Sequence, residues 1–366
     1  MSAPGHLLEL HLQMPAAADG AVGAERPLDL VLHEGECLAL LASGVRDVEP
    51  LVDALAGYRP ASPGQLLLRG RDIGDLPAGR RQIGLVSARD PLFDHLSVLA
   101  NLTFPLAARK LGRTESDHRI RQTLALLGLE GLAPRRAASL AAAERVRVAL
   151  ARVLVCEPAL IVLEHPTSGL TLTERRDLRQ ILRRLVRARG LSLLFATTER
   201  EEALVMGDRI GLLEGSRLHQ VGTASELLDR PANEAVAVWF GEANRLTGSV
   251  AWIEDDVAHV RLSAGPSMDC AAAPGLEEGG LCVVCVRPER IATAFVSDEE
   301  SFGEERLAGT LAEILHLGDH LRLRFRLAGG GEILARRPAA QPLGSLHADR
   351  SALLAWQAVH ATAFPQ

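Results

Sequence analysis

Lysine is almost absent from this sequence, and aromatic residues are scarce. The 366 residues include 40 lysines and arginines, of which Lys110 is the single lysine. Because no glycine stands just before Lys110, the chain contains no G-x-x-x-x-G-K-[ST] phosphate-binding loop. Aromatic residues make up 3% of the chain, and the net charge is −6. We therefore expect no nucleic-acid partner, since a basic surface and platforms for stacking bases are both lacking.

Long apolar runs are also missing. The stretch "RVALARVLVCEPALIVLEH" is broken by Arg152, Glu157 and Pro158, so it is too short to span a bilayer, which takes roughly 18 to 20 residues. The first residues lack the charged flank and cleavage site of a secretory signal. Five cysteines, an odd number, are typical of reduced thiols in a cytosol. No metal site is expected, because Cys282 and Cys285 should face opposite sides of one strand.

Apolar periodicity divides the chain into two parts. The first 235 or so residues alternate short apolar strands with longer amphipathic segments, as in an α/β domain with a largely parallel sheet. A long helical interval within this part predicts an inserted helical subdomain at about residues 92–156. Beyond it, short alternating strands between Gly, Pro and acidic turns predict a small all-β barrel. We predict domains at residues 1–238 and 239–366.

Four ordered segments resemble the ATP-binding subunit of ABC transporters, most closely the importer type found with spermidine/putrescine, iron and sulfate permeases. They are "HEGECLALLASG" with "LVDALAG", "RRQIGLVSARDPLFDHLSVLANLTFPL", "SLAAAERVRVALARVLVCEPALIVLEHPTSGL" and "FATTEREEALVMGDRIGLLEGSRLHQVG". "ANRLTGSV", "VRPERI" and "LGDHLRLRFRL" resemble the appended TOBE barrel. The resemblance implies a P-loop NTPase-type ABC nucleotide-binding domain followed by an OB-like TOBE domain. It also implies a membrane permease as partner, a homo- or heterodimer with another ATP-binding subunit, and a peripheral place on the cytoplasmic face of the cell membrane.

The phosphate loop of that family falls on a segment without its chemistry. The matching residues are Ala42, Ser43, Gly44, Val45, Arg46, Asp47, Val48, Glu49 and Pro50. Val48 stands at the position of the lysine and Glu49 at the position of the hydroxyl that binds Mg²⁺, although Arg46 could offer a substitute charge. Each carboxylate placed near 4 Å from a phosphate would cost on the order of 4 kcal/mol at an effective dielectric of about 20. Asp47, Glu49 and Pro50 are instead typical of an acidic helix start.

The other catalytic positions are altered as well. Residues matching the Q-loop glutamine, the Walker B pair, the D-loop aspartate and the switch histidine are Ala88, Glu164, His165, Thr171 and Thr198. The signature LSGGQ is matched by Leu140, Ala141, Ala142, Ala143 and Glu144. Glu164 could still bind Mg²⁺ and His165 could act as a base. Since the phosphate loop and the signature are both altered, neither composite site of a mixed dimer would be complete.

The segment expected to dock on the permease keeps its pattern. Its candidate contacts are Leu92, Phe93, His95 and Leu96, although apolar residues here can equally be core residues of the helical subdomain. We therefore expect an importer subunit with little or no ATPase activity and no cofactor, with a structural or regulatory role in the import of a solute, for which the resemblance suggests a polyamine. Two alternatives stay open: an active ATPase that binds Mg-ATP through atypical motifs, and a free-standing sensor whose barrel binds a small ligand.

Overall fold

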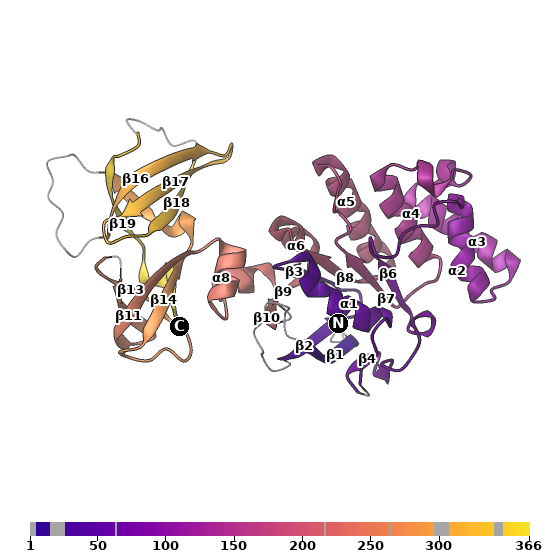
Figure 1. The fold of residues 1–366 in the computed structure, drawn as a ribbon, viewed down its shortest axis with the longest axis horizontal. Helices are drawn as coiled ribbons and strands as arrows, with labels where there is room; N and C mark the ends of the chain where they lie inside the picture. Colours follow the sequence, from indigo (N-terminus) through magenta and orange to yellow (C-terminus); the bar gives the residue numbers. More distant parts are fainter. Residues whose placement is uncertain are drawn as a thin grey trace. The chain divides into compact units, whose positions relative to one another are not determined.

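The computed structural model describes residues 5–14, 26–62, 64–215, 217–263, 265–295, 307–339 and 347–366. The chain divides into two compact units, Met1–Ala224 and Ser225–Gln366. Figure 1 shows the course of the chain through the helices and strands of each unit. The predicted domain boundary, between residues 238 and 239, falls inside helix α8 (Glu234–Gly241) and stays a prediction.

A six-stranded sheet forms the centre of the first unit. Its strand order is β10-β9-β3-β8-β7-β6, and all neighbours are parallel except β10 with β9. The strands are β3 (Cys37–Ala42), β6 (Ile83–Val86), β7 (Leu160–Glu164), β8 (Ser192–Thr197), β9 (Arg209–Glu214) and β10 (Arg217–Gly222). Every residue of β3, β7 and β8 is buried, as expected of parallel strands covered on both faces.

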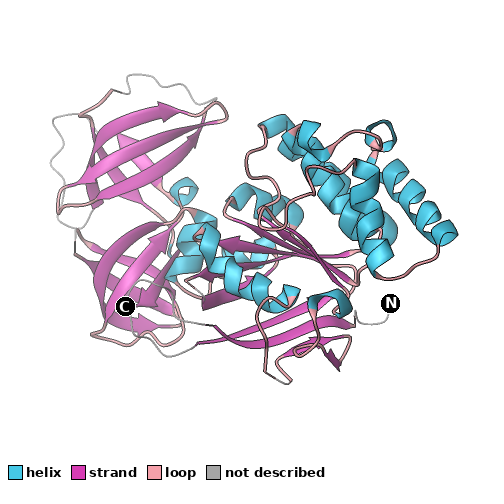
Figure 2. Cartoon of the chain, turned by 45° about the vertical axis from the view of Figure 1, so that its right-hand side comes forward, coloured by secondary structure: helices cyan, strands magenta, loops and turns pink. Residues whose placement is uncertain are grey.

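The sheet separates two hydrophobic clusters. Leu160 and Val162 of β7 pack on one side with α1 (Glu49–Ala56). That side also carries an antiparallel sheet of order β2-β1-β4-β5, formed by β1 (His6–Met14), β2 (Arg26–His33), β4 (Leu66–Leu68) and β5 (Arg71–Asp72). Ile161 and Leu163 face the other side, toward α4 (Ala142–Leu154) and α5 (Leu172–Arg189). Figure 2 distinguishes the helices of the chain from its strands by colour.

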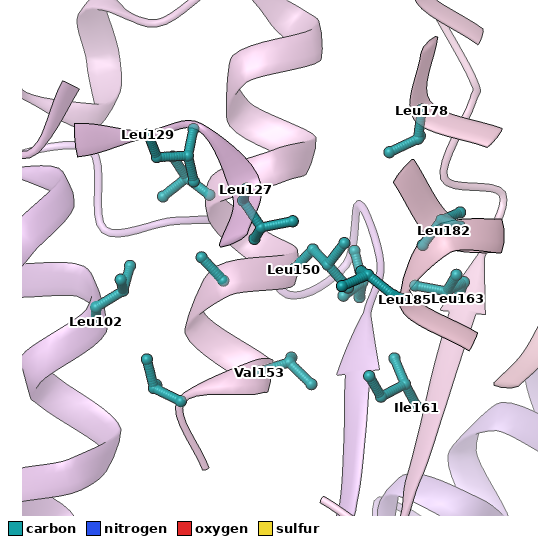
Figure 3. Close-up of a cluster of buried hydrophobic side chains, with 14 of the residues drawn as sticks. Leu102, Leu127, Leu129, Leu150, Val153, Ile161, Leu163, Leu178, Leu182 and Leu185 are labelled. Atoms are coloured by element: carbon teal, nitrogen blue, oxygen red, sulfur yellow. The ribbon is translucent and has the colours of Figure 1, made fainter. Parts of the chain in front are cut away.

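Three helices lie between β6 and β7, where the sequence predicts the helical subdomain. They are α2 (Val98–Ala108), α3 (Arg113–Leu127) and α4. Their apolar faces join β7 and α5 in one cluster (Figure 3), whose labelled residues are Leu102, Leu127, Leu129, Leu150, Val153, Ile161, Leu163, Leu178, Leu182 and Leu185. Short 3-10 turns at Val45–Val48, Ala78–Arg80, Glu130–Leu132 and Ala137–Ser139, together with α6 (Arg200–Met206), complete this unit.

The second unit contains the barrel that the sequence predicts. Its closed barrel has the order β11-β12-β13-β20-β14, with β11 (Asn244–Glu254), β12 (Val257–Leu262), β13 (Ser267–Ala272), β14 (Leu281–Val286) and β20 (Ala361–Pro365). A second sheet, β15-β19-β16-β17-β18, was not predicted separately; it has β15 (Ala292–Phe295), β16 (Leu307–His316), β17 (His320–Leu327), β18 (Glu332–Pro338) and β19 (Ser351–Ala355). Helices α7 (Ala224–Asp229) and α8 precede the barrel, and 3-10 turns stand at Pro288–Arg290 and Ala358–His360.

The architecture agrees with the predicted fold class: an α/β domain with inserted helices precedes a barrel domain. Cys282 and Cys285 pack into different hydrophobic clusters, so they face opposite sides of β14 as expected. Among the described residues, no group of three or more His, Cys, Asp or Glu side chains could hold a metal ion. None of the helices in the described part of the chain is long and apolar enough to cross a membrane.

Candidate functional site

At the phosphate-loop position, a carboxylate of the turn itself, that of Asp47, accepts hydrogen bonds from the turn. Strand β3 ends at Ala42, and a 3-10 turn over Val45–Val48 leads directly into α1. Asp47 Oδ2 accepts a 2.8 Å hydrogen bond from the backbone N–H of Gly44 and another from the Ser43 hydroxyl. Backbone N–H groups in such a loop are the groups that bind phosphate oxygens. Here one of them is already bonded to an anionic side chain of the same turn.

The residue at the lysine position points into the core. Val48 is fully buried and belongs to the hydrophobic cluster around α1 and β3. Arg46 is exposed on the 3-10 turn, with no side-chain hydrogen bond or ion pair among the described residues. Helix α1 begins at Glu49 with Pro50 in its first turn, where proline costs no hydrogen bond and a carboxylate suits the helix dipole.

An arginine neutralises the carboxylate at the Walker B position. Glu164, at the end of β7, is 6% exposed. Its Oε1 accepts a hydrogen bond from Arg89 Nη2 at 2.9 Å, and its Oε2 accepts bonds from Arg89 Nε at 3.2 Å and from the Ser87 hydroxyl. Arg89 Nη1 also donates to Asp53 Oδ1 of α1 at 2.8 Å. Burial lowers the pKa of Arg89, but these bonds outweigh it and the pKa lies above its ordinary value.

His165 and Ala88 lie beside this ion pair. His165 adopts a positive φ of 45°, and its Nε2 lies 3.2 Å from the carbonyl oxygen of Val45. Because a carbonyl can only accept, this nitrogen carries the proton, and the ring bridges β7 to the phosphate-loop turn. Ala88, at the Q-loop position, stands in the exposed turn after β6, next to Arg89. Its methyl group has no polar atom with which to bind a metal or water.

Thr171 has a structural role at the start of α5. Its hydroxyl accepts the backbone N–H of Glu174, whose carboxylate in turn accepts the backbone N–H of Thr171 at 2.8 Å. This reciprocal cap lowers the pKa of Glu174. Thr198 is half-buried after β8, and its side chain makes no hydrogen bond among the described residues. Its neighbour Thr197 donates instead to the buried Glu202 of α6 at 2.8 Å.

The signature position is also capped by the chain's own carboxylate. Ala141 is the N-cap of α4, and residues 142–144 form the helix's first turn. Glu144 Oε2 accepts the backbone N–H of Ala141 at 2.9 Å. Leu140 is buried in the helical cluster. The helix N-terminus that would otherwise offer N–H groups to an anion is thus partly satisfied from within.

The segment predicted to dock on the permease is held in a defined turn. Asn101 is fully buried; its Oδ1 accepts the N–H of Phe93, and its Nδ2 donates to the carbonyl of Phe93. Leu92 is a core residue, whereas Phe93 and Leu96 are half-buried and His95 is exposed. The Phe93 ring contacts Phe104 edge-on at 4.7 Å, and Phe104 is 54% exposed.

Arg89, Asp53 and Glu202 were missed by the sequence analysis. Arg89 follows the Q-loop position, but it is 75 residues from Glu164, and nothing in the local sequence pairs the two. Glu202 is 2% exposed and joins Thr167 to Thr197, with distances of 2.7 and 2.8 Å from the two hydroxyls. Nothing in the local sequence "EREEAL" distinguishes Glu202 from the acidic residues beside it.

Comparison with known proteins supports the predicted family for both parts of the chain. The family profile described as "ABC transporter" matches residues 49–168, and that of the TOBE domain matches residues 284–364. The spermidine/putrescine import ATP-binding protein PotA 1 of Pseudomonas aeruginosa is 33% identical over 323 residues, covering 87% of this chain and 86% of that protein. The chain belongs to the family of ABC transporter ATP-binding subunits.

One further relative matches most of the chain, and one solved structure matches the fold of part of it. The spermidine/putrescine import ATP-binding protein PotA of Rubrobacter xylanophilus is 29% identical over 358 residues, covering 97% of this chain and 93% of that protein. Among solved structures, cbiO1 of Clostridium perfringens, part of the ABC transporter complex cbiONQ, matches with a TM-score of 0.52 and 23% identity. It covers 61% of this chain and 90% of that structure, and at this identity it supports the fold alone.

Proposed function

We propose that this ABC transporter subunit acts in polyamine import as a structural or regulatory member that does not hydrolyse ATP. The relatives that span most of its length are spermidine/putrescine import subunits, which favours a polyamine importer. The observation that carries the proposed loss of activity is the carboxylate of Asp47, bonded to the N–H of Gly44 where a phosphate would bind.

The phosphate-loop turn disfavours ATP for two reasons. A triphosphate would have to displace Asp47 from Gly44 and would then lie beside a carboxylate. At an effective dielectric of about 20, one like-charge contact near 4 Å costs on the order of 4 kcal/mol, whereas a helix dipole contributes roughly 0.3 to 2 kcal/mol. With Val48 turned into the core, no lysine offsets that repulsion.

The metal position has a similar problem. Three donor groups from Arg89 and Ser87 occupy the Glu164 carboxylate. Mg²⁺ binding there would bring a divalent cation next to a guanidinium that is also held by Asp53. The residues present therefore do not fit Mg-ATP, and we infer that no cofactor is bound. The Arg89 guanidinium balances the negative charge of the Glu164 carboxylate, as a bound metal ion would in an active site.

The proposed partners are a membrane permease and a second ATP-binding subunit, identical or different, with the chain peripheral to the cytoplasmic face of the membrane. Partly exposed Leu99 and Phe104, beside Phe93 and His95, offer an apolar surface for a permease segment. A partner subunit would not complete an ATP site with this chain, because Glu144 caps the signature helix as Asp47 closes the phosphate loop.

Calorimetric titration with Mg-ATP tests the loss of nucleotide binding. The wild-type chain is compared with a competent polyamine-import subunit and with a variant carrying Asp47→Gly, Val48→Lys and Glu49→Ser. We expect no micromolar binding by the wild type and measurable binding by the variant, without turnover while Arg89 is present. Micromolar binding with turnover by the wild type would establish the alternative, an active ATPase with atypical motifs.

Polyamine uptake tests the importer role separately. Deleting the gene should reduce uptake of labelled putrescine, and both the wild type and an Asp47→Asn variant should restore it, because the proposed role does not use phosphate binding. Unchanged uptake after deletion would exclude polyamine import, whatever the calorimetry shows.

A further inference from the structure

Helix α5 is strongly basic although the chain as a whole is acidic. Its 18 residues include seven arginines against one glutamate and one aspartate, whereas the whole chain has a net charge of −6. The bias extends to the inserted helices: residues 101–189 contain 17 arginines and lysines and 8 aspartates and glutamates. Positive charge is therefore concentrated in one part of the first compact unit.

One face of α5 is fixed in the core and the opposite face is exposed. The buried face consists of three leucines in the cluster of Figure 3: Leu178, Leu182 and Leu185. Because an α-helix has 3.6 residues per turn, Arg176, Arg183 and Arg187 lie on the opposite face, with Arg184 beside them. All four arginines are exposed, and together they are called the outer face of α5 below.

The outer face differs from the other arginines near it on the same helix. Arg175 and Arg179 each lie 3.6 Å from a carboxylate at the start of α6. No side chain of the outer face forms an ion pair or a hydrogen bond with any residue that the structure describes. Arg183 and Arg187 are four residues apart and Arg184 and Arg187 are three apart, spacings at which like charges weaken a helix. An anionic surface would relieve this repulsion.

Charge complementarity favours phospholipid headgroups as the partner of the outer face. Arg176 and Arg187, at its two ends, are separated by about 16 Å along the helix axis at 1.5 Å per residue. Arginine suits phosphate oxygens, because it presents five N–H donors in a fixed fork. The cytoplasmic loops of membrane proteins carry an excess of lysine and arginine, so they would repel this face. Helix α5 also contains no aromatic residue on which a nucleic-acid base could stack.

We propose that the outer face of α5 binds anionic lipid headgroups of the cytoplasmic leaflet of the membrane. This inference rests on the proposed peripheral place of the chain and adds a contact that the chain makes itself, without the permease. The contact is electrostatic, since the outer face consists of charged side chains and α5 has no aromatic anchor for insertion. Each arginine near an anionic membrane surface strengthens binding about fivefold, equivalent to about 1 kcal/mol.

Sedimentation with lipid vesicles tests the proposal on the full chain. The vesicles contain phosphatidylcholine alone or with about one-third phosphatidylglycerol, whose headgroup is anionic. We expect binding to the anionic vesicles at about 0.1 M salt, where charges act over about 10 Å, and release at about 1 M salt, where they act over about 3 Å. Replacing all four arginines of the outer face by glutamine should weaken binding at least about a hundredfold.

A second fourfold variant controls for the loss of charge alone. It replaces by glutamine four exposed arginines outside α5 whose side chains form no ion pair or hydrogen bond with described residues: Arg59, Arg71, Arg80 and Arg326. Its net charge equals that of the outer-face variant, but it should bind within about twofold of the wild type, since salt screens distant charges. Circular dichroism at 222 nm checks that both variants fold. If the fourfold outer-face variant does not fold, Arg183→Gln with Arg187→Gln should still weaken binding about 25-fold.

The outcomes are separate from those that test the proposed function, because the vesicles contain neither permease nor nucleotide. Absence of binding to anionic vesicles, equal binding to both kinds of vesicle, or equal losses in the two fourfold variants would each overturn the proposal. Binding of polyglutamate or duplex DNA by the outer face, without binding to vesicles, would assign this face to another partner and would also overturn it. A failed uptake test would leave the vesicle result unchanged, and a failed vesicle test would leave the uptake result unchanged.

Discussion

Replacing Arg89 by alanine should destabilise the first compact unit by about 2 kcal/mol. The change removes two of the three hydrogen bonds to Glu164 and leaves that carboxylate, 6% exposed, without a cation. Removing one partner of a buried ion pair costs about 3 to 5 kcal/mol. The Arg89 side chain is itself 36% exposed, so water screens the pair and we place the cost below that range.

A double-mutant cycle separates the ion pair from the loss of the side chain alone. Glu164→Gln keeps the shape of the side chain and removes its charge, so Arg89→Ala should cost less in that background. We expect a coupling energy of about 1 to 2 kcal/mol, typical of groups in direct contact. Arg176→Ala, which removes an exposed arginine of α5, is the matched control and should change stability by less than about 0.5 kcal/mol.

Unfolding of the two units in urea can be measured separately, because each unit has its own spectroscopic signal. All three tryptophans, Trp239, Trp252 and Trp356, lie in the second unit, so their fluorescence reports on that unit. Helices α1 to α6 lie in the first unit, and circular dichroism at 222 nm is dominated by them. Arg89→Ala should shift the dichroism transition and leave the fluorescence transition in place. A coupling energy near zero, or a loss no larger than that of Arg176→Ala, would refute the inferred role of Arg89.

Three local contacts give further expectations. Thr171→Ala should cost about 1 kcal/mol in the same dichroism assay because it removes the cap of α5, and a neutral result would contradict that role. Gly84→Ala should lower the free energy of unfolding by about 2 kcal/mol, since its Cβ would lie 2.1 Å from Cγ1 of Val153 in α4. Wild-type stability of this variant would show that α4 can shift away from β6. A thiol reagent at pH 8 should label only the half-buried Cys156 quickly in the native chain and all five cysteines in urea. Burial raises the pKa of all five thiols, to about 12 for Cys270 and Cys285. The expected contrast therefore comes from access to the reagent, and fast native labelling of Cys37, Cys270, Cys282 or Cys285 would contradict their burial.

The sheet could be predicted because its signals are local. Continuous apolar runs at β3, β7 and β8 are typical of strands buried on both faces, and the structure buries every residue of the three. Strand β2 is harder to recognise in the sequence, although it carries a period of two, with Leu28, Leu30 and Leu32 buried. Pro27 near its start, in a segment that looks like a turn, masked the alternation.

The site could be predicted only in part, because its main contacts join residues that are far apart in the sequence. The acidic start of α1 follows from Asp47, Glu49 and Pro50, which are neighbours in the sequence. The bond from the Gly44 N–H to the Asp47 carboxylate spans three residues, from the N-cap to the third residue of the 3-10 turn, as in a capping box. By contrast, Arg89 meets Glu164 and Asp53 only because parallel strands bring the ends of β6 and β7 next to each other and α1 packs beneath them.

Residues at the altered positions now stabilise the fold, so replacing Val48 by lysine alone should lower the stability of the first unit. Val48→Lys would place an ammonium group in a fully buried position of the α1 cluster, because the bonds of Asp47 hold the turn that directs residue 48 inward. We expect a loss of about 2 to 4 kcal/mol in the dichroism transition, the range for an unpaired buried charge that relaxes toward solvent. Adding Asp47→Gly frees the turn, so the double variant should lose less than the sum of the two single changes. Additive losses would mean that contacts other than those of Asp47 hold the turn. Wild-type stability of Val48→Lys would mean that the side chain of residue 48 can turn out of the core toward the phosphate-loop position, which would favour the alternative of an active ATPase with atypical motifs.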